Sequence, residues 1–177
     1  MSPEIPELRD RLSDGEVQLR TSTAWDIPDI LIAHQDDQEL HRMLGLARPP
    51  SGAELGSAAE RDSAERAAGT AVKLTIVGPG SDDCRGRVEA NEIDWDRGSA
   101  QLSIWVAPQL RGHGLAPRAL RLAATWLFGT VGLRRLTLEV NADNVAMLRA
   151  AEAAGFERRS DGRTVVLALD SEELSDA

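Results

Sequence analysis

The chain has 177 residues, of which 42% are hydrophobic and 28% charged, a balance that predicts one globular domain and excludes collagen-like, low-complexity and wholly disordered chains. The net charge of −9 argues against a nucleic-acid binder, because a phosphate backbone attracts a basic surface. From the sequence we expect neither a membrane helix nor a secretory signal, and the single cysteine, Cys84, excludes an internal disulfide. We therefore expect a cytoplasmic protein with no membrane or nucleic-acid partner.

The first half of the chain is predicted to be mainly helical after an initial strand. Val17–Thr23 alternates apolar and polar residues, which indicates a strand. Trp25–Leu46 has apolar residues at helical spacing and predicts one helix or two short ones. After the break at Arg48–Gly52, the stretch Ala53–Ala68 is rich in Ala, Glu and Arg and predicts an exposed helix that ends at Gly69.

The second half alternates strands and helices, and its first three strands are expected to form an antiparallel meander. The predicted strands are Ala71–Val77, Gly86–Trp95, Ala100–Val106, Leu133–Val140 and Thr164–Leu169, and the predicted helices are Gly114–Phe128 and Val145–Ala154. The fold class is thus α/β (α+β), with a mixed, mostly antiparallel, twisted sheet of six or seven strands and about four helices. We expect this single domain to span residues 1–170, followed by an acidic tail at 171–177.

Charge is distributed unevenly along the chain. Residues 97–138 contain six arginines and no Asp or Glu, so this block carries a charge of +6 and the rest of the chain −15. The block indicates a small anionic ligand nearby, and a solvated, arginine-rich helix face is the alternative.

The segment Gln109–Ala116 lies between a predicted strand and a predicted helix. Gly112 and Gly114 let the backbone approach a bulky anion, and the start of the helix presents unpaired N–H groups and the positive end of its dipole. Arg111 can add charge-assisted hydrogen bonds. The segment therefore predicts a pyrophosphate site, unless the glycines serve only the turn between strand and helix.

A second segment lies farther along the chain. Val140–Asn144 (VNADN) is followed by Glu152–Phe156 (EAAGF). Together with AQLSIWVAPQLRGHGLAPRAL, which begins at Ala100, this segment resembles the GNAT superfamily of acyl-CoA-dependent N-acyltransferases, in particular its RimJ/RimL-like branch. The resemblance runs from about Gly86 to Phe156.

The resemblance implies that the fourth and fifth strands, Ala100–Val106 and Leu133–Val140, splay apart and hold acetyl-CoA, or another short acyl-CoA, as co-substrate. The backbone of the first strand would bind the pantetheine arm, the loop would bind the pyrophosphate, and two asparagines would lie beside the pantetheine. The implied cofactor-binding residues are Ile104, Trp105, Val106, Arg111, Gly112, His113, Gly114, Leu115, Ala116, Asn141 and Asn144. Turn and helix-capping roles would also explain both asparagines.

The catalytic groups of the family are not matched in full. Many members have a Tyr that protonates the departing thiolate, but its place here is Ala151 and the chain contains no Tyr. Gln101 and Ile104 stand where many members of this branch have Glu and Tyr. The candidate catalytic bases are Glu89 and Glu92, with Asp94 beside them. All three are also explained as solvated strand residues.

The resemblance implies transfer of an acetyl group to a primary amine, either a protein N-terminus or a small molecule. One alternative is a non-catalytic acyl-CoA-binding domain with a regulatory or interaction role, and another is a structural domain whose glycine loop binds nothing. His34, Asp37 and His41 share a helical region, but an amphipathic helix explains them and we expect no metal. The chain is expected to be a monomer or a homodimer.

Overall fold

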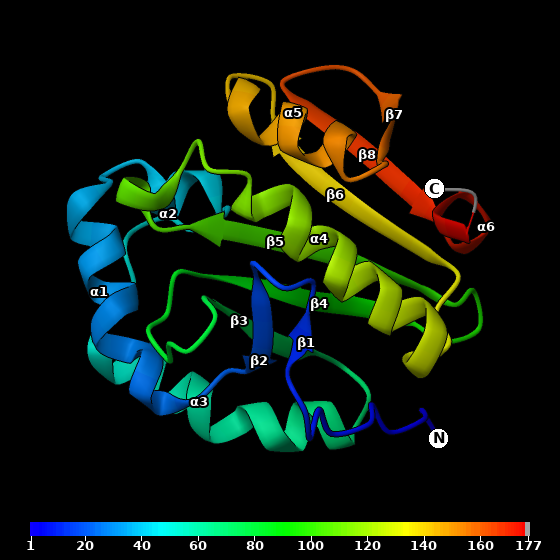
Figure 1. The fold of residues 1–177 in the computed structure, drawn as a ribbon, viewed down its shortest axis with the longest axis horizontal. Coiled ribbons are helices and arrows are strands. Elements are labelled where there is room, and N and C mark those ends of the chain that lie inside the picture. Colours follow the sequence, from blue (N-terminus) through cyan, green and yellow to red (C-terminus); the bar gives the residue numbers. More distant parts are fainter. Residues whose placement is uncertain (176–177) are drawn as a thin grey trace.

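The computed structural model describes residues 1–175, within which eight strands form one mixed sheet (Figure 1). The strand order is β1-β2-β3-β4-β5-β6-β8-β7. All neighbouring strands are antiparallel except β5 and β6, which are parallel. The strands are β1 (Leu12–Ser13), β2 (Gln18–Thr21), β3 (Val72–Val77), β4 (Gly86–Asp94), β5 (Ser99–Val106), β6 (Arg135–Asn141), β7 (Glu157–Ser160) and β8 (Thr164–Asp170).

Four substantial helices accompany the sheet: α1 (Ile27–Asp36), α3 (Gly52–Ala67), α4 (Leu115–Trp126) and α5 (Val145–Ala153). The shorter helical elements are η1 (Ala24–Asp26), α2 (Leu40–Met43), η2 (Pro108–Leu110), the π-helical turn η3 (Leu127–Val131) and α6 (Ser171–Ser175). Within residues 1–175, none of the helices combines the length and apolar character needed to cross a membrane.

The predicted mixed, mostly antiparallel sheet and its helices are confirmed, and the region 25–46 forms two helices, α1 and α2. The predicted number of six or seven strands is wrong, because residues 1–175 contain eight. The sequence gives little sign of the two additional strands. β1 has only two residues, and β7 (Glu157–Ser160) is exposed throughout and lacks apolar alternation. β7 forms through backbone pairing with β8.

The region expected to be an acidic tail begins with a helix. Ser171–Ser175 form α6, and the carboxylate of Glu173 accepts a hydrogen bond from the backbone N–H of Asp170 at 2.9 Å. The remainder of the expected tail, residues 176–177, lies outside the described residues. The short helix therefore follows β8 directly, and this hydrogen bond links it to the last residue of the strand.

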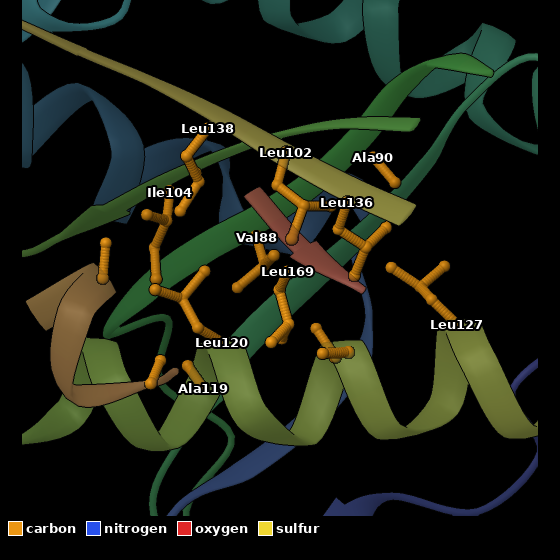
Figure 2. Close-up of a cluster of buried hydrophobic side chains, with 14 of the residues drawn as sticks. Val88, Ala90, Leu102, Ile104, Ala119, Leu120, Leu127, Leu136, Leu138 and Leu169 are labelled. Atoms are coloured by element: carbon orange, nitrogen blue, oxygen red, sulfur yellow. The ribbon is translucent and has the colours of Figure 1, made fainter. Parts of the chain in front are cut away.

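The main core lies between one face of the sheet and α4 (Figure 2). Ala119, Ala123 and Ala124 on α4 are fully buried, and their small side chains let the helix lie close to the strands. Figure 2 shows Leu120 of α4 directed toward strand side chains that include Val88, Ile104 and Leu138. Because side chains alternate along a strand, the neighbours of Leu102 and Ile104 on β5 face the opposite side of the sheet.

The opposite face of β5 packs against the first helices. Trp105 forms a smaller apolar cluster with Ile30 and Ala33 of α1, Leu40 of α2, and Cys84. This cluster joins α1 and α2 to β5. Figure 1 shows the corner between these two helices beside the end of β5. Residues from this corner will form one wall of the candidate site.

Asp26, just before α1, is a buried carboxylate that fixes the start of this helix. It accepts hydrogen bonds from Arg20 at 2.6 Å, from the Thr75 hydroxyl at 2.7 Å and from the backbone N–H of Thr23 at 3.0 Å. Burial alone would raise the pKa of Asp26, but these hydrogen bonds outweigh it and lower the pKa below the usual aspartate value. The network ties α1 to β2 and β3.

Gly86 opens β4 at a point where the backbone of β5 lies close to it. A Cβ at this position would collide with the backbone carbonyl of Trp105 and crowd Val106. The absence of a side chain therefore lets β4 hold the last residues of β5 in register, as the pair Gly86 and Val106 shows.

Candidate active site

The two parallel strands of the sheet are paired along only part of their length. β5 and β6 pair from Ser99 with Arg135 to Leu102 with Leu138, and no further. Beyond Leu102, β5 stays paired with β4, and β6 stays paired with β8 as far as Asn141. The strands therefore diverge toward their C-terminal ends, as Figure 1 shows. The fourth and fifth strands predicted from the sequence correspond to β5 and β6, and the predicted splay between them is confirmed. It opens a cleft of about 580 Å³.

The backbone of β5 presents an unpaired edge to this cleft. Gly98 accepts hydrogen bonds on the β6 side, from the N–H of Arg135 at 3.1 Å, whereas Ala107 donates on the β4 side, to Arg85 at 2.8 Å. Because alternate residues of a strand direct their backbone groups to opposite sides, Ile104 and Val106 face the cleft and Trp105 faces β4. The ladder to β6 ends at Leu102, so Ile104 has no strand partner on that side.

A helix N-terminus closes the end of the cleft nearest Val106. The chain passes through η2, then through Gly112 and Gly114, whose φ angles are +79° and +76°. Gly114 is the N-cap of α4 and provides no capping side chain, so the first N–H groups of the helix remain without an intrahelical partner. A Cβ on either glycine would meet no heavy atom within 4 Å. The space beside this backbone is open.

Arg111, in the same loop, is tied to both sides of the cleft. Its Nη1 lies 2.8 Å from Oδ2 of Asp37, and its Nε donates to the carbonyl of Val106 at 3.0 Å. Asp37 follows α1 and also accepts the backbone N–H of Glu39 at 3.0 Å. Burial would raise the pKa of Asp37, but the hydrogen bonds from Arg111 and Glu39 outweigh it and lower the pKa. Asp37 is thus a carboxylate at pH 7.

The two asparagines that follow β6 serve the local backbone and also line the cleft. The side-chain oxygen of Asn141 accepts the N–H of Asp143 at 3.1 Å, and that of Asn144 caps α5 by accepting the N–H of Met147 at 3.2 Å. Both residues border the cleft. These bonds use the amide oxygens, and neither side-chain NH₂ group forms a hydrogen bond with the described residues.

The structure brings most of the predicted cofactor-binding residues to one cleft. Those that line it are Ile104, Trp105, Val106, Arg111, Gly112, Gly114, Leu115, Ala116, Asn141 and Asn144. His113 is not among the described residues that line it, and its Nδ1 lies 3.2 Å from the carbonyl oxygen of Leu110. The lining therefore joins the two segments that the sequence analysis selected.

The predicted bases Glu89 and Glu92 are not among the described residues that line the cleft. Glu89 pairs in register with Ser103, which does line it, so this carboxylate lies one strand away. Glu92 has a φ of +47° at an irregularity of β4 and borders a separate hollow at the opposite end of β5. The two candidate bases therefore lie at different places along β4, and neither of them borders the cleft.

Sequence reasoning missed a carboxylate that does line the cleft, Glu139 of β6. It follows Leu138, the last residue paired with β5, and its neighbours Leu138 and Val140 point into the core. Glu139 is exposed and has no ion pair or side-chain hydrogen bond within the described part of the chain. Its signal in the sequence was the single charge between the apolar residues of LTLEV, at the C-terminal end of a splayed strand.

The wall opposite β6 comes from α2 and the corner before it, which no motif had identified. Asp37, Glu39, Leu40, Met43 and Leu44 line the cleft. His34 lies behind this wall, and burial, together with the nearby His41, lowers its pKa, although Asp37 acts in the opposite direction. Among residues 1–175, no three potential metal ligands form a cluster.

Ala151 occupies the place of the missing Tyr but has no exposed surface and belongs to the main core. The residues of α5 that border the cleft are Ala146, Met147, Arg149 and Ala150. A side chain of α5 that donates a proton would therefore have to come from one of the positions that border the cleft, not from position 151.

Residues 16–157 match the family model described as "Acetyltransferase (GNAT) domain". No curated protein sequence matches the chain. Many solved structures resemble it, at identities too low to show more than a shared fold.

Three of these structures illustrate the degree of similarity in fold and in sequence. Spermidine N-acetyltransferase from Vibrio cholerae, solved with CoA and spermine, has a TM-score of 0.78 and 18% identity, over 90% of this chain and 98% of its own. RimJ from Mycobacterium smegmatis, solved with CoA-disulfide, has a TM-score of 0.73 and 21% identity, over 89% and 83%. RimL, a ribosomal L7/L12 alpha-N-protein acetyltransferase solved without ligand, has a TM-score of 0.77 and 16% identity, over 94% and 99%.

Proposed function

Because the chain belongs to the acetyltransferase (GNAT) domain family, we propose that it transfers an acetyl or other short acyl group from CoA to a primary amine. One observation carries the proposal: the unpaired edge of β5 opens into a cleft that ends at the N-terminus of α4. An unpaired strand edge suits the amide groups of pantetheine, and a helix N-terminus with adjacent glycines suits a diphosphate.

The groups that line the cleft support the binding of CoA. Ile104 and the N–H of Val106 would hydrogen-bond the pantetheine amides, and the open surface of Gly112 and Gly114 would admit the diphosphate. The free NH₂ of Asn144 supports a contact with the pantetheine from the opposite side. When bound, acetyl-CoA supplies the thioester whose carbonyl carbon the amine attacks.

Attack requires a neutral amine, so a base must accept a proton from the ammonium group. We assign this role to Glu139, because it is the unpaired carboxylate at the point where the strands begin to diverge. Glu139 accepts the ammonium proton and releases it to solvent. The nitrogen of the neutral amine then forms a bond to the thioester carbon, the carbon–sulfur bond breaks, and the second N–H proton passes to the Glu139 carboxylate. Sulfur leaves as thiolate and takes its proton from solvent, which agrees with the absence of Tyr from the chain.

The walls of the cleft favour a cationic acceptor. Asp37, Glu39 and Glu139 border it, together with the cations Arg111 and Arg149. Arg111 pairs with Asp37, and Glu139 forms no ion pair with any cation of the described residues. Such a site suits a protein N-terminus, which is the substrate named for RimL, or a polyamine, which is the substrate named for the spermidine enzyme.

The test is turnover of acetyl-CoA against a panel of peptides, polyamines and aminoglycosides, with release of CoA as the signal. We expect turnover with at least one amine. Glu139→Gln should lower kcat by about 10²- to 10⁴-fold, the range for a positioned general base, while CoA affinity by calorimetry stays unchanged.

Two further variants examine the bases predicted from the sequence. Glu92→Gln removes a carboxylate at the opposite end of β5 and should retain wild-type turnover. Glu89→Gln removes one that lies a strand away from the cleft. If Glu89→Gln abolishes turnover and Glu139→Gln does not, the base is Glu89, acting through water, and our assignment is wrong.

The second candidate function is a CoA-binding domain that performs no chemistry. It is favoured by the burial of Ala151, because no side chain there can protonate the thiolate. Tight binding of CoA without turnover of any amine in the panel would support this function over transfer.

A further inference from the structure

The ion pair between Arg111 and Asp37 joins the two substrate regions of the cleft. Arg111 belongs to the loop that precedes α4, and Asp37 belongs to the corner between α1 and α2. We propose that this pair is a switch: the diphosphate of CoA draws Arg111 away from Asp37, and the released Asp37 carboxylate then binds the ammonium group of the acceptor. This inference rests on the proposed function, because it assumes that CoA and an amine occupy the cleft.

Arg111 is positioned to change partners. Its side chain is 44% exposed, and it is adjacent to Gly112, beside the open space at the start of α4. A guanidinium binds a phosphate through two parallel hydrogen bonds, and a diphosphate carries more negative charge than one carboxylate. A diphosphate at the N-terminus of α4 would therefore compete directly with Asp37 for Arg111.

Asp37 is prepared to act once Arg111 has left. Its Oδ1 is held by the backbone N–H of Glu39 at 3.0 Å, which fixes the orientation of the carboxylate, while Oδ2 forms the ion pair with Arg111. Release of Arg111 leaves Oδ2 facing the cleft without a cation. A half-buried carboxylate in this state attracts a replacement cation, and the acceptor ammonium is the cation that the proposed reaction brings.

The exchange predicts the direction of coupling between the substrates. Without CoA, Arg111 neutralises Asp37 and adds a positive charge that opposes an ammonium group. When CoA is bound, its phosphate pairs with Arg111 in place of Asp37. The carboxylates of Asp37 and Glu139, which border the cleft, are then both without a cation. CoA should therefore strengthen amine binding, and by linkage the amine should strengthen CoA binding by the same factor.

A static role for the pair predicts the opposite result. If Asp37 only braces the loop, then Arg111 keeps this partner when CoA binds, and the loss of Asp37 loosens the diphosphate site. The two roles thus differ in the sign of one measurement, the change in CoA affinity when Asp37 is neutralised.

The experiment is calorimetric titration of CoA into wild type, Asp37→Asn and Asp36→Asn. Partly exposed ion pairs contribute about 0.2 to 1 kcal/mol, so removal of the competing partner in Asp37→Asn should tighten CoA binding by about 1.5- to 5-fold. Asp36→Asn removes the same charge one residue earlier, at an exposed position that does not border the cleft. It should leave CoA affinity unchanged and thereby controls for net charge.

The Arg111→Gln background shows whether the effect passes through the ion pair. In a protein that already carries Arg111→Gln, the further change Asp37→Asn should not alter CoA affinity, because the arginine for which Asp37 and the diphosphate compete is absent. Weaker or unchanged CoA binding in the Asp37→Asn single variant would overturn the switch. A wild type that does not bind CoA at all would instead overturn the proposed function, so the two failures are distinct.

Steady-state kinetics test the second half of the switch. The probe is the amine with the highest turnover in the panel, measured at saturating acetyl-CoA. Asp37→Asn should raise its KM by about 1.5- to 5-fold with kcat retained, the range for a partly exposed ion pair, whereas Asp36→Asn should leave both unchanged. An unchanged KM in Asp37→Asn would show that Asp37 does not bind the acceptor.

Discussion

The substitution Gly112→Ala tests whether the loop before α4 is the diphosphate site. Gly112 has a φ of +79°, and a Cβ there would meet no heavy atom within 4 Å. The folded protein therefore tolerates the methyl group sterically, and the cost is that of placing an L-residue in the left-handed region, about 1 to 2 kcal/mol. For a chain of this length the melting temperature should fall by about 2 to 8 °C.

The effect on CoA should be much larger than this strain explains. The new methyl group would occupy the open space through which the diphosphate approaches the backbone. We expect CoA affinity to fall at least about tenfold, which corresponds to roughly 1.4 kcal/mol. Isothermal titration with CoA and thermal unfolding of the same samples measure the two effects separately.

Gly80→Ala is the matched control. Gly80 has a φ of +68° and equally open surroundings, but it lies in the turn after β3 and does not border the cleft. This variant should lose a similar amount of stability and keep wild-type CoA affinity. If both variants bind CoA as wild type does, the loop is not the diphosphate site and the reasoning from the glycine pair is refuted.

Two further predictions concern stability and the missing acid. Because the pKa of Asp26 is lower in the folded protein than in the unfolded chain, its stabilising effect is complete above about pH 4 and is lost as the pH falls through the folded value; acid unfolding of Asp26→Asn should show a weaker pH dependence, and an unchanged dependence would exclude this carboxylate as the cause. Ala151→Tyr should lower the unfolding free energy by about 1 to 3 kcal/mol without faster turnover, because it overfills the core; faster turnover at unchanged stability would show that position 151 faces the thioester.

The fold was predictable where local patterns and long-range packing agree. The alternating residues of the three central strands pair as the sequence suggested, and the glycine pair precedes α4 as expected. β7 was missed because Glu157–Ser160 is a polar strand at the edge of the sheet, where backbone pairing replaces side-chain burial. Local composition does not report that kind of stabilisation.

The candidate site was predictable on the CoA side and not on the acceptor side. Its glycines and asparagines follow one another in a spacing that the family resemblance covers. The acceptor wall depends instead on Asp37 meeting Arg111, two residues far apart in the sequence whose contact follows only from the packing of α1 against β5.

The acid-free block of the sequence illustrates the same limit. The block indicated a small anionic ligand nearby or a solvated, arginine-rich helix face, yet Arg111 pairs with Asp37, Arg118 with Asp14, and Arg135 with Asp170. Each acid comes from outside the block. A segment that contains no acidic residue can therefore still have acidic residues of other segments beside it in the fold. An arginine of this block is available to an anionic ligand only if the ligand displaces the acidic partner.

The pairing of Arg111 also explains how the edge of β5 remains stable before a ligand arrives. A strand that leaves its neighbour exposes carbonyl groups that need donors, and the Nε of Arg111 supplies one to Val106. The same side chain neutralises Asp37. If the diphosphate draws Arg111 away, the Val106 carbonyl and the Asp37 carboxylate are released in one movement. The first would then accept a hydrogen bond from a pantetheine amide and the second would bind the amine, so one arginine would make the two halves of the cleft available together.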